Sequence, residues 1–503
     1  MPYIPTENDL RLVLQRNKIW TLRLEVLNIR YQILAAIEGE ALGAQITISA
    51  ESDMRRTCSL DMLVKDASYQ ISESSYFWLD KYIRVYYGLY DLANQDTSYY
   101  LLGTYMLCDN AYSYNVSERR LTLGLVDLMA RGTDARGSAQ GSQQTLIEAG
   151  GSIRGAMIST LSQMMGVERY KIIDFPSNQI EVPYDLEFSA GVYPYEILRQ
   201  LCDLYPCREI YFDIDGTFVC GNVPSGVNDI LTLDKTYMDA LLISERRDIA
   251  FSAIKNVTEI WGQEIEAERT AASCVTSDAV YQIAVSDITT LDDGVSYCFT
   301  PDTTNVANMR LQINETTDCP IVIRNDLQDG TYRYDPVEAG VMLANRPYVV
   351  YYSESKFLLY GELNIHAIAM AVNAEPTNDE KAEYEAMFAC HDIKYVVNPL
   401  DVFAVERLGI IRQTLTGDTY DNIYTTQLAL DHAAYENWKT TRLQDVVNLE
   451  IIAVPWLDVN QLLEYTSPST GAVLRVMTQS ISFDLTAGTM AITASKYYPY
   501  YPW

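Results

Sequence analysis

Strands of alternating apolar and polar residues stand near both ends of the chain, and this pattern constrains the fold more than any other feature. In the first of them, Trp20, Leu22, Leu24 and Val26 alternate with polar side chains. The same period recurs at 45–49, 58–62, 83–87, 103–109 and 120–126. A period of two residues is typical of strands that bury one face. Residues 1–130 are therefore predicted to form a tube-like antiparallel β-barrel.

The C-terminal end carries a second set of alternating strands. Along 474–483 we expect Val476, Ser480 and Ser482 on one face and Met477, Ile481 and Phe483 on the other. A Gly-containing turn then leads into 490–493. Both ends thus close with a long strand, a bend and a returning strand, at 103–126 and 474–494. This shared ending is what a duplicated domain would show.

Residues 131–245 are predicted to be a linker followed by an α+β domain. The stretch 131–152 is rich in Gly and Ser, as in flexible connections. Apolar residues at helical spacing follow over 153–165 and stop at Gly166, and a second helix is expected from Pro194. Strand-like segments lie at 180–182, 209–212 and 217–220.

A second tube-like β-barrel is predicted from 246–263 together with 396–503. It includes a helix over 425–442, whose Leu430, Ala434 and Trp438 form one apolar face expected to lie across the barrel. Between the two parts, 264–372 is predicted to be an inserted β module and 373–395 a connector. The module's order of Asp292-Asp293-Gly294, a Leu-x-Ile-Asn strand at 311–314, Pro320-Ile321 and Ala339-Gly340 resembles the fibre-like β modules of phage tail fibres and receptor-binding proteins. The predicted fold class is mainly β, with two barrels, an α+β domain and the inserted module.

The order of segments near the C-terminus resembles that of a known family. A helix is followed by Pro455-Trp456-Leu457-Asp458-Val459-Asn460 and then by the closing hairpin. This resembles the tail-hub proteins of tailed bacteriophages. The resemblance implies a homotrimeric virion protein in the tail tip or baseplate, made in the host cytoplasm. Its implied partners are the distal tail tube protein, the tape measure protein, and tail fibre or receptor-binding proteins; phage DNA would pass through without specific binding.

Composition agrees with an assembling protein rather than with a nucleic-acid binder. The 37 basic and 67 acidic residues leave a net charge of −30, which repels phosphate. The 38 tyrosines favour contacts with partners. Nine cysteines without a CxxC pair predict neither disulfides nor zinc. The first residues show no signal peptide, and no apolar run is long enough to span a membrane, so cytoplasmic synthesis is expected.

Several motifs offer other functions. Asp213-Ile214-Asp215-Gly216-Thr217 follows a strand as in Mg²⁺-dependent phosphatases, but Asp-Gly is also typical of hairpin turns, which is the interpretation we favour. Cys390-His391 and the separate His366 and His432 form no catalytic order. The acidic Asp292, Asp293 and Asp302 lack the spacing of a calcium loop and are taken as a solvated turn.

Aromatic residues of the inserted module are the candidate contacts with a receptor or partner. They are Tyr348, Tyr351, Tyr352, Phe357 and Tyr360. Their rings offer a stacking platform for sugars, although alternation places some of them inside the module. We predict no catalytic residue, cofactor or metal. The alternatives are a tail-associated enzyme, either a lysin or a phosphatase using Asp213 and Asp215, and a host-glycan-binding module.

Overall fold

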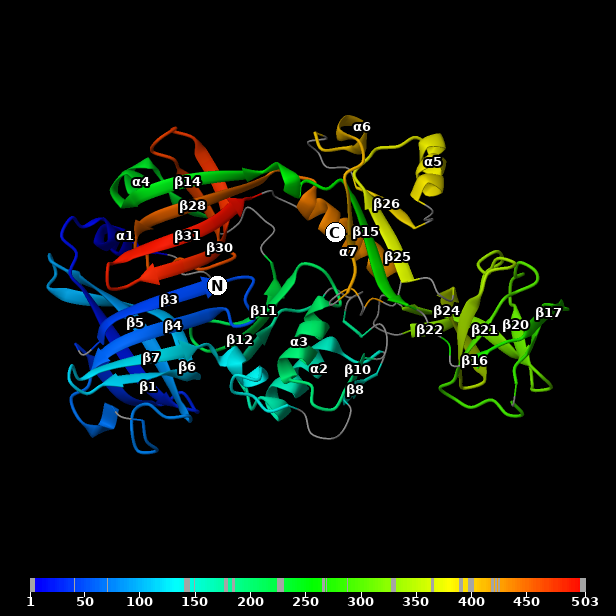
Figure 1. Cartoon of the computed structure of the whole chain (residues 1–503), viewed down its shortest axis with the longest axis horizontal. Helices are drawn as coiled ribbons and strands as arrows, with labels where there is room; N and C mark the ends of the chain where they lie inside the picture. Colours follow the sequence, from blue (N-terminus) through cyan, green and yellow to red (C-terminus); the bar gives the residue numbers. More distant parts are fainter. Residues whose placement is uncertain are drawn as a thin grey trace.

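The fold was analysed in a computed structural model of the chain (Figure 1). The structure describes residues 5–497 apart from short segments. These are 40, 70, 140–144, 149, 176–179, 183–185, 224–229, 265–266, 268, 287, 327–331, 363–365, 389–391, 397–401, 418–419, 421–422 and 424–425. None of the helices within this described part combines the length and the apolar character needed to cross a membrane.

One curled sheet of thirteen described strands dominates the molecule and contains the N-terminal strands and the closing hairpin of the two predicted barrels. In spatial order it runs β14 (Leu242–Ala250), β28 (Gln444–Ile452), β31 (Thr489–Lys496), β30 (Val473–Asp484), β3 (Ala41–Ser49), β4 (Arg56–Leu63), β7 (Arg120–Val126), β6 (Asp96–Asn115), β5 (Lys81–Asp91), β1 (Trp20–Asn28) and β2 (Ile33–Glu38). The short strands β13 (Leu231–Leu233) and β29 (Leu462–Thr466) pair with each other beside β30. The helices α1 (Glu7–Leu14) and α4 (Lys235–Leu241) pack against this body.

The two predicted barrels share a single core because β3 pairs directly with β30. The alternating residues of the N-terminal strands and of the closing hairpin fill that core, as the sequence predicts. One detail of the prediction is wrong: Val476, not Met477, shares the buried face with Ile481 and Phe483. A β-bulge at Gln479, between the pairs Thr478↔Ala494 and Ser480↔Thr493, adds one residue and reverses the alternation.

The α+β domain lies beside the N-terminal part of the large sheet (Figure 1). Its elements are β8 (Thr145–Ile147), α2 (Ile153–Ser159) continued by a π-helical turn (Thr160–Met164), β9 (Tyr170–Ile172), β10 (Leu186–Phe188), α3 (Pro194–Asp203), β11 (Arg208–Phe212) and β12 (Phe218–Asn222). Both predicted helices form, and Gly166 follows the first with a φ of 62°, the left-handed conformation expected of a C-terminal glycine. A 3₁₀ helix, Leu128–Gly132, connects this domain to β7.

A separate four-stranded sheet joins the α+β domain to the inserted module. Its order is β26 (Ile393–Tyr395), β25 (His366–Val372), β15 (Val257–Glu264) and β27 (Arg412–Leu415), and its helices are α5 (Asn378–Phe388), α6 (Val405–Leu408) and α7 (Thr426–Thr440). The sequence placed the strand containing Glu259 and Gly262 in the second barrel, which is wrong. β15 pairs with β25 and β27, and β14, just before it, is the strand that enters the large sheet.

The long helix α7 also differs from its predicted position. It packs on β25 and β15 rather than across the large sheet. Ala434 is buried, with Leu430 and Trp438 packed against the same core, which also contains residues of α2 and α3. His432 on this helix is buried and its Nε2 lies 3.3 Å from the carbonyl oxygen of Leu204. The helix therefore connects the small sheet to the α+β domain.

The inserted module is a nine-stranded sheet with its own core, at the end of the molecule opposite the large sheet (Figure 1). Its strands are β16 (Arg269–Thr270), β17 (Ser273–Ser277), β18 (Val280–Ala284), β19 (Ser296–Phe299), β20 (Arg310–Ile313), β21 (Cys319–Asp326), β22 (Tyr332–Pro336), β23 (Tyr348–Ser353) and β24 (Lys356–Glu362). The predicted end at 372 is too late, because β25 belongs to the small sheet. Glu264 and His366 pair where the module leaves and rejoins that sheet.

Candidate assembly interface

The large sheet contains the same four-stranded unit twice. In chain order, β3, β4, β6 and β7 occupy the spatial order β3-β4-β7-β6, and β14, β28, β30 and β31 occupy the order β14-β28-β31-β30. Each unit therefore runs first, second, fourth, third. The last two strands form a hairpin with a four-residue turn in each unit, since Asn115 pairs with Arg120 and Asp484 with Thr489.

The pairing registers of the two units also agree. When the two turns are matched, the β4–β7 pairing gives Leu60 the position that the β28–β31 pairing gives Leu449. The β3–β4 and β14–β28 pairings then give Gln45 and Arg246 equivalent positions. The first strand of each unit carries a register shift at the same place, between Ala41 and Gly43 and between Leu242 and Ser244. Matching order, register and bulge make the two units structural repeats.

The units meet at a seam between the third strand of one and the first strand of the other. β30 and β3 are antiparallel, and Ile46 faces Phe483 while Ile48 faces Ile481. All four of these side chains are buried in the common core. The backbone ladder extends to Leu485, whose N–H donates to the carbonyl of Ala44 over 2.9 Å. The seam is therefore as well formed as the pairings inside each unit.

The outer face of the seam is covered by small polar side chains. They are Gln45, Thr47, Ser59, Ser480, Ser482 and Thr493, from four adjacent strands. Positive charges at its margins are paired: Arg120 with Asp61 at 2.5 Å and Arg246 with Asp248 at 3.0 Å. Such a face offers phosphate no array of unpaired cations.

A buried arginine ties the first unit to two other parts of the chain. The side chain of Arg56, in β4, is 1% exposed; its Nη1 donates to the carbonyl oxygen of Phe212 over 2.6 Å and its Nη2 pairs with Asp458. Burial opposes the charged form of Arg56, but Asp458 leads the nearby anions that keep its pKa above the ordinary value. Next to it, Arg55 pairs with Glu209. Nothing in the local sequence pattern marks these arginines.

Asp127 is fully buried beside the same arginines. Its carboxylate accepts the backbone N–H of Arg56 over 3.0 Å and that of Met129 over 2.9 Å, where it caps the 3₁₀ helix. Burial raises the pKa of Asp127 to about 6, against these two hydrogen bonds and the charge of Arg56. Asp127 thus links β4 of the first unit to the 3₁₀ helix that leads into the α+β domain.

The candidate phosphatase motif is a hairpin turn, as we favoured from the sequence. Asp213 and Thr217 close the turn between β11 and β12, with the N–H of Asp213 donating to the Thr217 carbonyl over 2.8 Å. Gly216 has a φ of 81°. Asp215 pairs with Arg169 at 3.0 Å. Among the described residues, no three His, Cys, Asp or Glu side chains gather in a way that could hold a metal ion.

Side chains of the large sheet donate hydrogen bonds to the main-chain carbonyls of this turn. Besides Arg56, the Thr104 hydroxyl donates to the carbonyl of Ile214 over 2.8 Å, and the Tyr31 hydroxyl donates to that of Gly216 over 2.8 Å. The Arg84 guanidinium donates to the carbonyl of Asp215 over 3.4 Å. These hydrogen bonds attach the α+β domain to the large sheet.

The five candidate aromatic residues are divided between the inside and the outside of the inserted module. Tyr348 and Phe357 belong to its buried core, and Tyr352 packs on Phe357 with ring centroids 5.1 Å apart. Tyr360 is 56% exposed and lies 5.8 Å from the half-buried ring of Tyr351, at a tilt of 41°. Only this last pair remains as a possible platform.

The other candidate side chains are engaged in local contacts or lie outside the described residues. Asp302 accepts from the hydroxyl and the N–H of Thr276, and Asp293 accepts from the N–H of Glu354. Burial lowers the pKa of His432. Cys390 and His391 lie outside the described residues, as does the side chain of His366.

One family model and several solved structures match this chain. Residues 401–501 match the family model described as a domain of unknown function, DUF5048. No curated protein matches the chain. The structure is similar to the 43 kDa tail protein of prophage MuSo2 from Shewanella oneidensis, with 12% identity, coverage of 94% of this chain and 98% of that one, and a TM-score of 0.45. The tail protein of Neisseria meningitidis MC58 is 7% identical, with coverage of 94% of this chain and 96% of that one and a TM-score of 0.46. Prophage tail protein gp18 of Listeria monocytogenes EGD-e is 9% identical, with coverage of 94% of each chain and a TM-score of 0.41.

Proposed function

We propose that this chain is a structural protein of a phage-type tail, acting as a ring-shaped hub in the tail tip or baseplate. Three copies form the ring, which adapts a sixfold tail tube to a threefold tip and encloses the channel through which DNA leaves. The observation that carries this proposal is the repeated four-stranded unit in one continuous sheet. Two equivalent units per chain give six equivalent positions in a trimer.

The polar face of the seam supports a channel role. A sheet with an apolar core on one face leaves the other face to solvent or to a lumen. Here that face carries short hydroxyl and amide side chains with few charges, so a phosphate backbone would slide along it without being held. The formal net charge of −30 acts in the same direction.

The inserted module extends from the opposite end of the molecule and is proposed to face away from the channel (Figure 1). There it presents the exposed Tyr360 with Tyr351 beside it. In this arrangement the tail tube protein and the tape measure protein meet the ring, whereas fibre or receptor-binding proteins meet its periphery.

Mass measurement and imaging of the purified chain test the proposal. We expect a species of three times 56.9 kDa that appears as a ring in projection images, alone or after addition of the tail tube protein. A stable monomer at micromolar concentration that forms no ring with the tail tube protein would contradict it. A lysin or a phosphatase would instead reveal itself as peptidoglycan or phosphoester hydrolysis by the purified chain.

A further inference from the structure

The eight strands of the two repeated units end in two edges with no further partner among the described strands. One edge is β14, which pairs only with β28. The other is the second half of β6, where Tyr112, Ser113, Tyr114 and Asn115 pair with β7 on one side. On its other side β6 pairs with β5 only up to Tyr105. Both edges therefore offer backbone N–H and C=O groups for a ladder.

The internal seam shows which strands can meet at these edges. It joins the third strand of one unit, β30, to the first strand of the other, β3. The equivalent free strands are β6, a third strand, and β14, a first strand. We propose that β6 of one copy pairs antiparallel with β14 of the next copy, in the register of the seam. This inference rests on the proposed function and names the surface by which the copies join.

The register follows residue by residue from the matched units. Gln45 faces Asp484 at the seam, and their equivalents are Arg246 and Asn115. Asn115 of one copy therefore lies opposite Arg246 of the next. Two further pairs follow along the strands, namely Ser113 opposite Asp248 and Tyr112 opposite Ile249.

Exposed apolar side chains mark the same two edges. Ile249 is 44% exposed, Tyr112 40% and Val116, in the turn after β6, 74%. Their equivalents at the internal seam are, in the same order, Ile48, Ile481 and Leu485, which are 3%, 0% and 0% exposed. The chain thus carries apolar residues at edge positions whose counterparts are buried by a neighbouring unit. A second copy in the seam register would cover all three.

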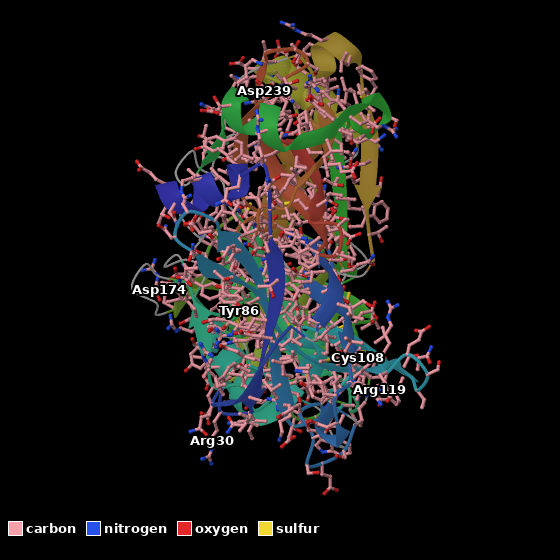
Figure 2. The ribbon with its side chains drawn as sticks, turned by 90° about the vertical axis from the view of Figure 1, so that its left-hand side faces the viewer. Arg30, Tyr86, Cys108, Arg119, Asp174 and Asp239 are labelled. Atoms are coloured by element: carbon pink, nitrogen blue, oxygen red, sulfur yellow. The ribbon has the colours of Figure 1, made fainter. Side chains whose placement is uncertain are left out.

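The placement of the edges fits a head-to-tail joint. Asp239, in α4 beside β14, lies at the top of the view in Figure 2, and Arg119, in the turn after β6, projects at its lower right. Because the two edges are different surfaces on different sides of one body, each copy can join two neighbours. Such heterologous joints form a ring when the rotation closes. Three joints between copies and three seams within copies complete the six positions.

Cysteine cross-linking measures the register directly. The seam pair Gln45↔Asp484 lies between hydrogen-bonded pairs such as Ala44↔Leu485, so its Cα atoms are close enough for a disulfide. We expect the double variant Asn115→Cys/Arg246→Cys to give covalent dimers and closed trimers under mild oxidation with diamide. The matched control Gln45→Cys/Asp484→Cys is expected to cross-link only within one chain.

The outcomes separate this inference from the proposed function. A wild-type trimer whose Asn115→Cys/Arg246→Cys variant stays uncross-linked, while the control forms its internal disulfide, refutes the β6–β14 joint and leaves the hub function standing. Covalent products that stop at dimers refute a head-to-tail joint. A wild-type chain that stays monomeric with the tail tube protein overturns both proposals.

A charge at an exposed edge residue gives an independent measurement. Ile249→Asp is expected to weaken the association of the copies at least about tenfold, because it places an unpaired carboxylate against an apolar partner. Since Ile249 is exposed in the single chain, the circular dichroism spectrum and the thermal midpoint of the monomer are expected to stay unchanged. Unchanged association of this variant would refute the joint.

Discussion

Replacement of Arg56 by Met tests the contact that holds the first unit, the α+β domain and the C-terminal segment together. The substitution removes the hydrogen bond to the Phe212 carbonyl and the ion pair with Asp458, both made by a side chain that is 1% exposed. Removing one partner of a buried ion pair leaves the other charge uncompensated and typically costs about 3–5 kcal/mol. Asp458 keeps some contact with water, so we expect a loss near the lower limit, about 3 kcal/mol.

The matched control is Arg120→Met, which removes a solvent-exposed ion pair with Asp61. Exposed pairs contribute about 0–1 kcal/mol, so this variant is expected to unfold almost like the wild type. The assay is urea denaturation followed by circular dichroism, with the first transition compared among the three proteins. If Arg56→Met and Arg120→Met shift that transition equally, Arg56 does not hold these parts together.

A double variant separates the ion pair from the other contacts of Arg56. In Arg56→Met/Asp458→Asn the stranded carboxylate is absent, so we expect part of the lost stability to return, about 1 kcal/mol or more. The Phe212 carbonyl would still lack its donor. Strictly additive losses would show that Arg56 and Asp458 do not interact in solution.

Three further predictions concern other parts of the molecule. Burial raises the pKa of Asp127 to about 6, so the folded state binds a proton more tightly than the unfolded state. The free energy of unfolding should therefore fall by about 3 kcal/mol as pH rises from about 4 to 6. Urea midpoints measured across this range should show the fall in the wild type and not in Asp127→Asn. Deleting 264–372 with a short Gly/Ser bridge would also remove β25, so the corrected deletion is 265–365, and it should leave the circular dichroism and the assembly of the rest intact; aggregation would show that the module is part of the hub core. Asp213→Asn should change no measurable reaction in a phosphatase assay with Mg²⁺, and a wild-type phosphatase activity lost in this variant would overturn the hairpin interpretation.

The elements with strong local signals could be predicted from the sequence. The alternation of Leu22 and Leu24 marks β1, Pro194 marks the start of α3, and the Asp-Gly pair before Thr217 marks the turn between β11 and β12. In each case the signal and the structure lie within a few residues of each other. The hairpin β6–β7 and its counterpart β30–β31 were found for the same reason.

The features that depend on distant pairing could not be predicted in this way. The strand around Glu259 is apolar on one side wherever it pairs, so its sequence does not show that β25 and β27 are its neighbours. The bulge at Gln479 changes the buried face without a Gly or Pro to mark it. Arg56 looks like an ordinary surface residue until Phe212 and Asp458 are brought to it from distant parts of the chain.

The hydrogen bonds to the β11–β12 turn determine which sequence changes the turn can accept. Four side chains of the large sheet and its β1–β2 turn donate to main-chain carbonyls, from Phe212 to Gly216, and every amino acid carries such a carbonyl. At Gly216 a Cβ would meet the Tyr31 ring at 2.9 Å, so this position is constrained. Substitutions elsewhere in the turn that preserve its backbone course leave the attachment intact, whereas an inserted or deleted residue would move all four acceptors at once. Selection on this contact acts on the length and backbone shape of the turn more than on the identity of most of its side chains. The sequence of the turn can therefore change during evolution while the large sheet and the α+β domain keep their relative position.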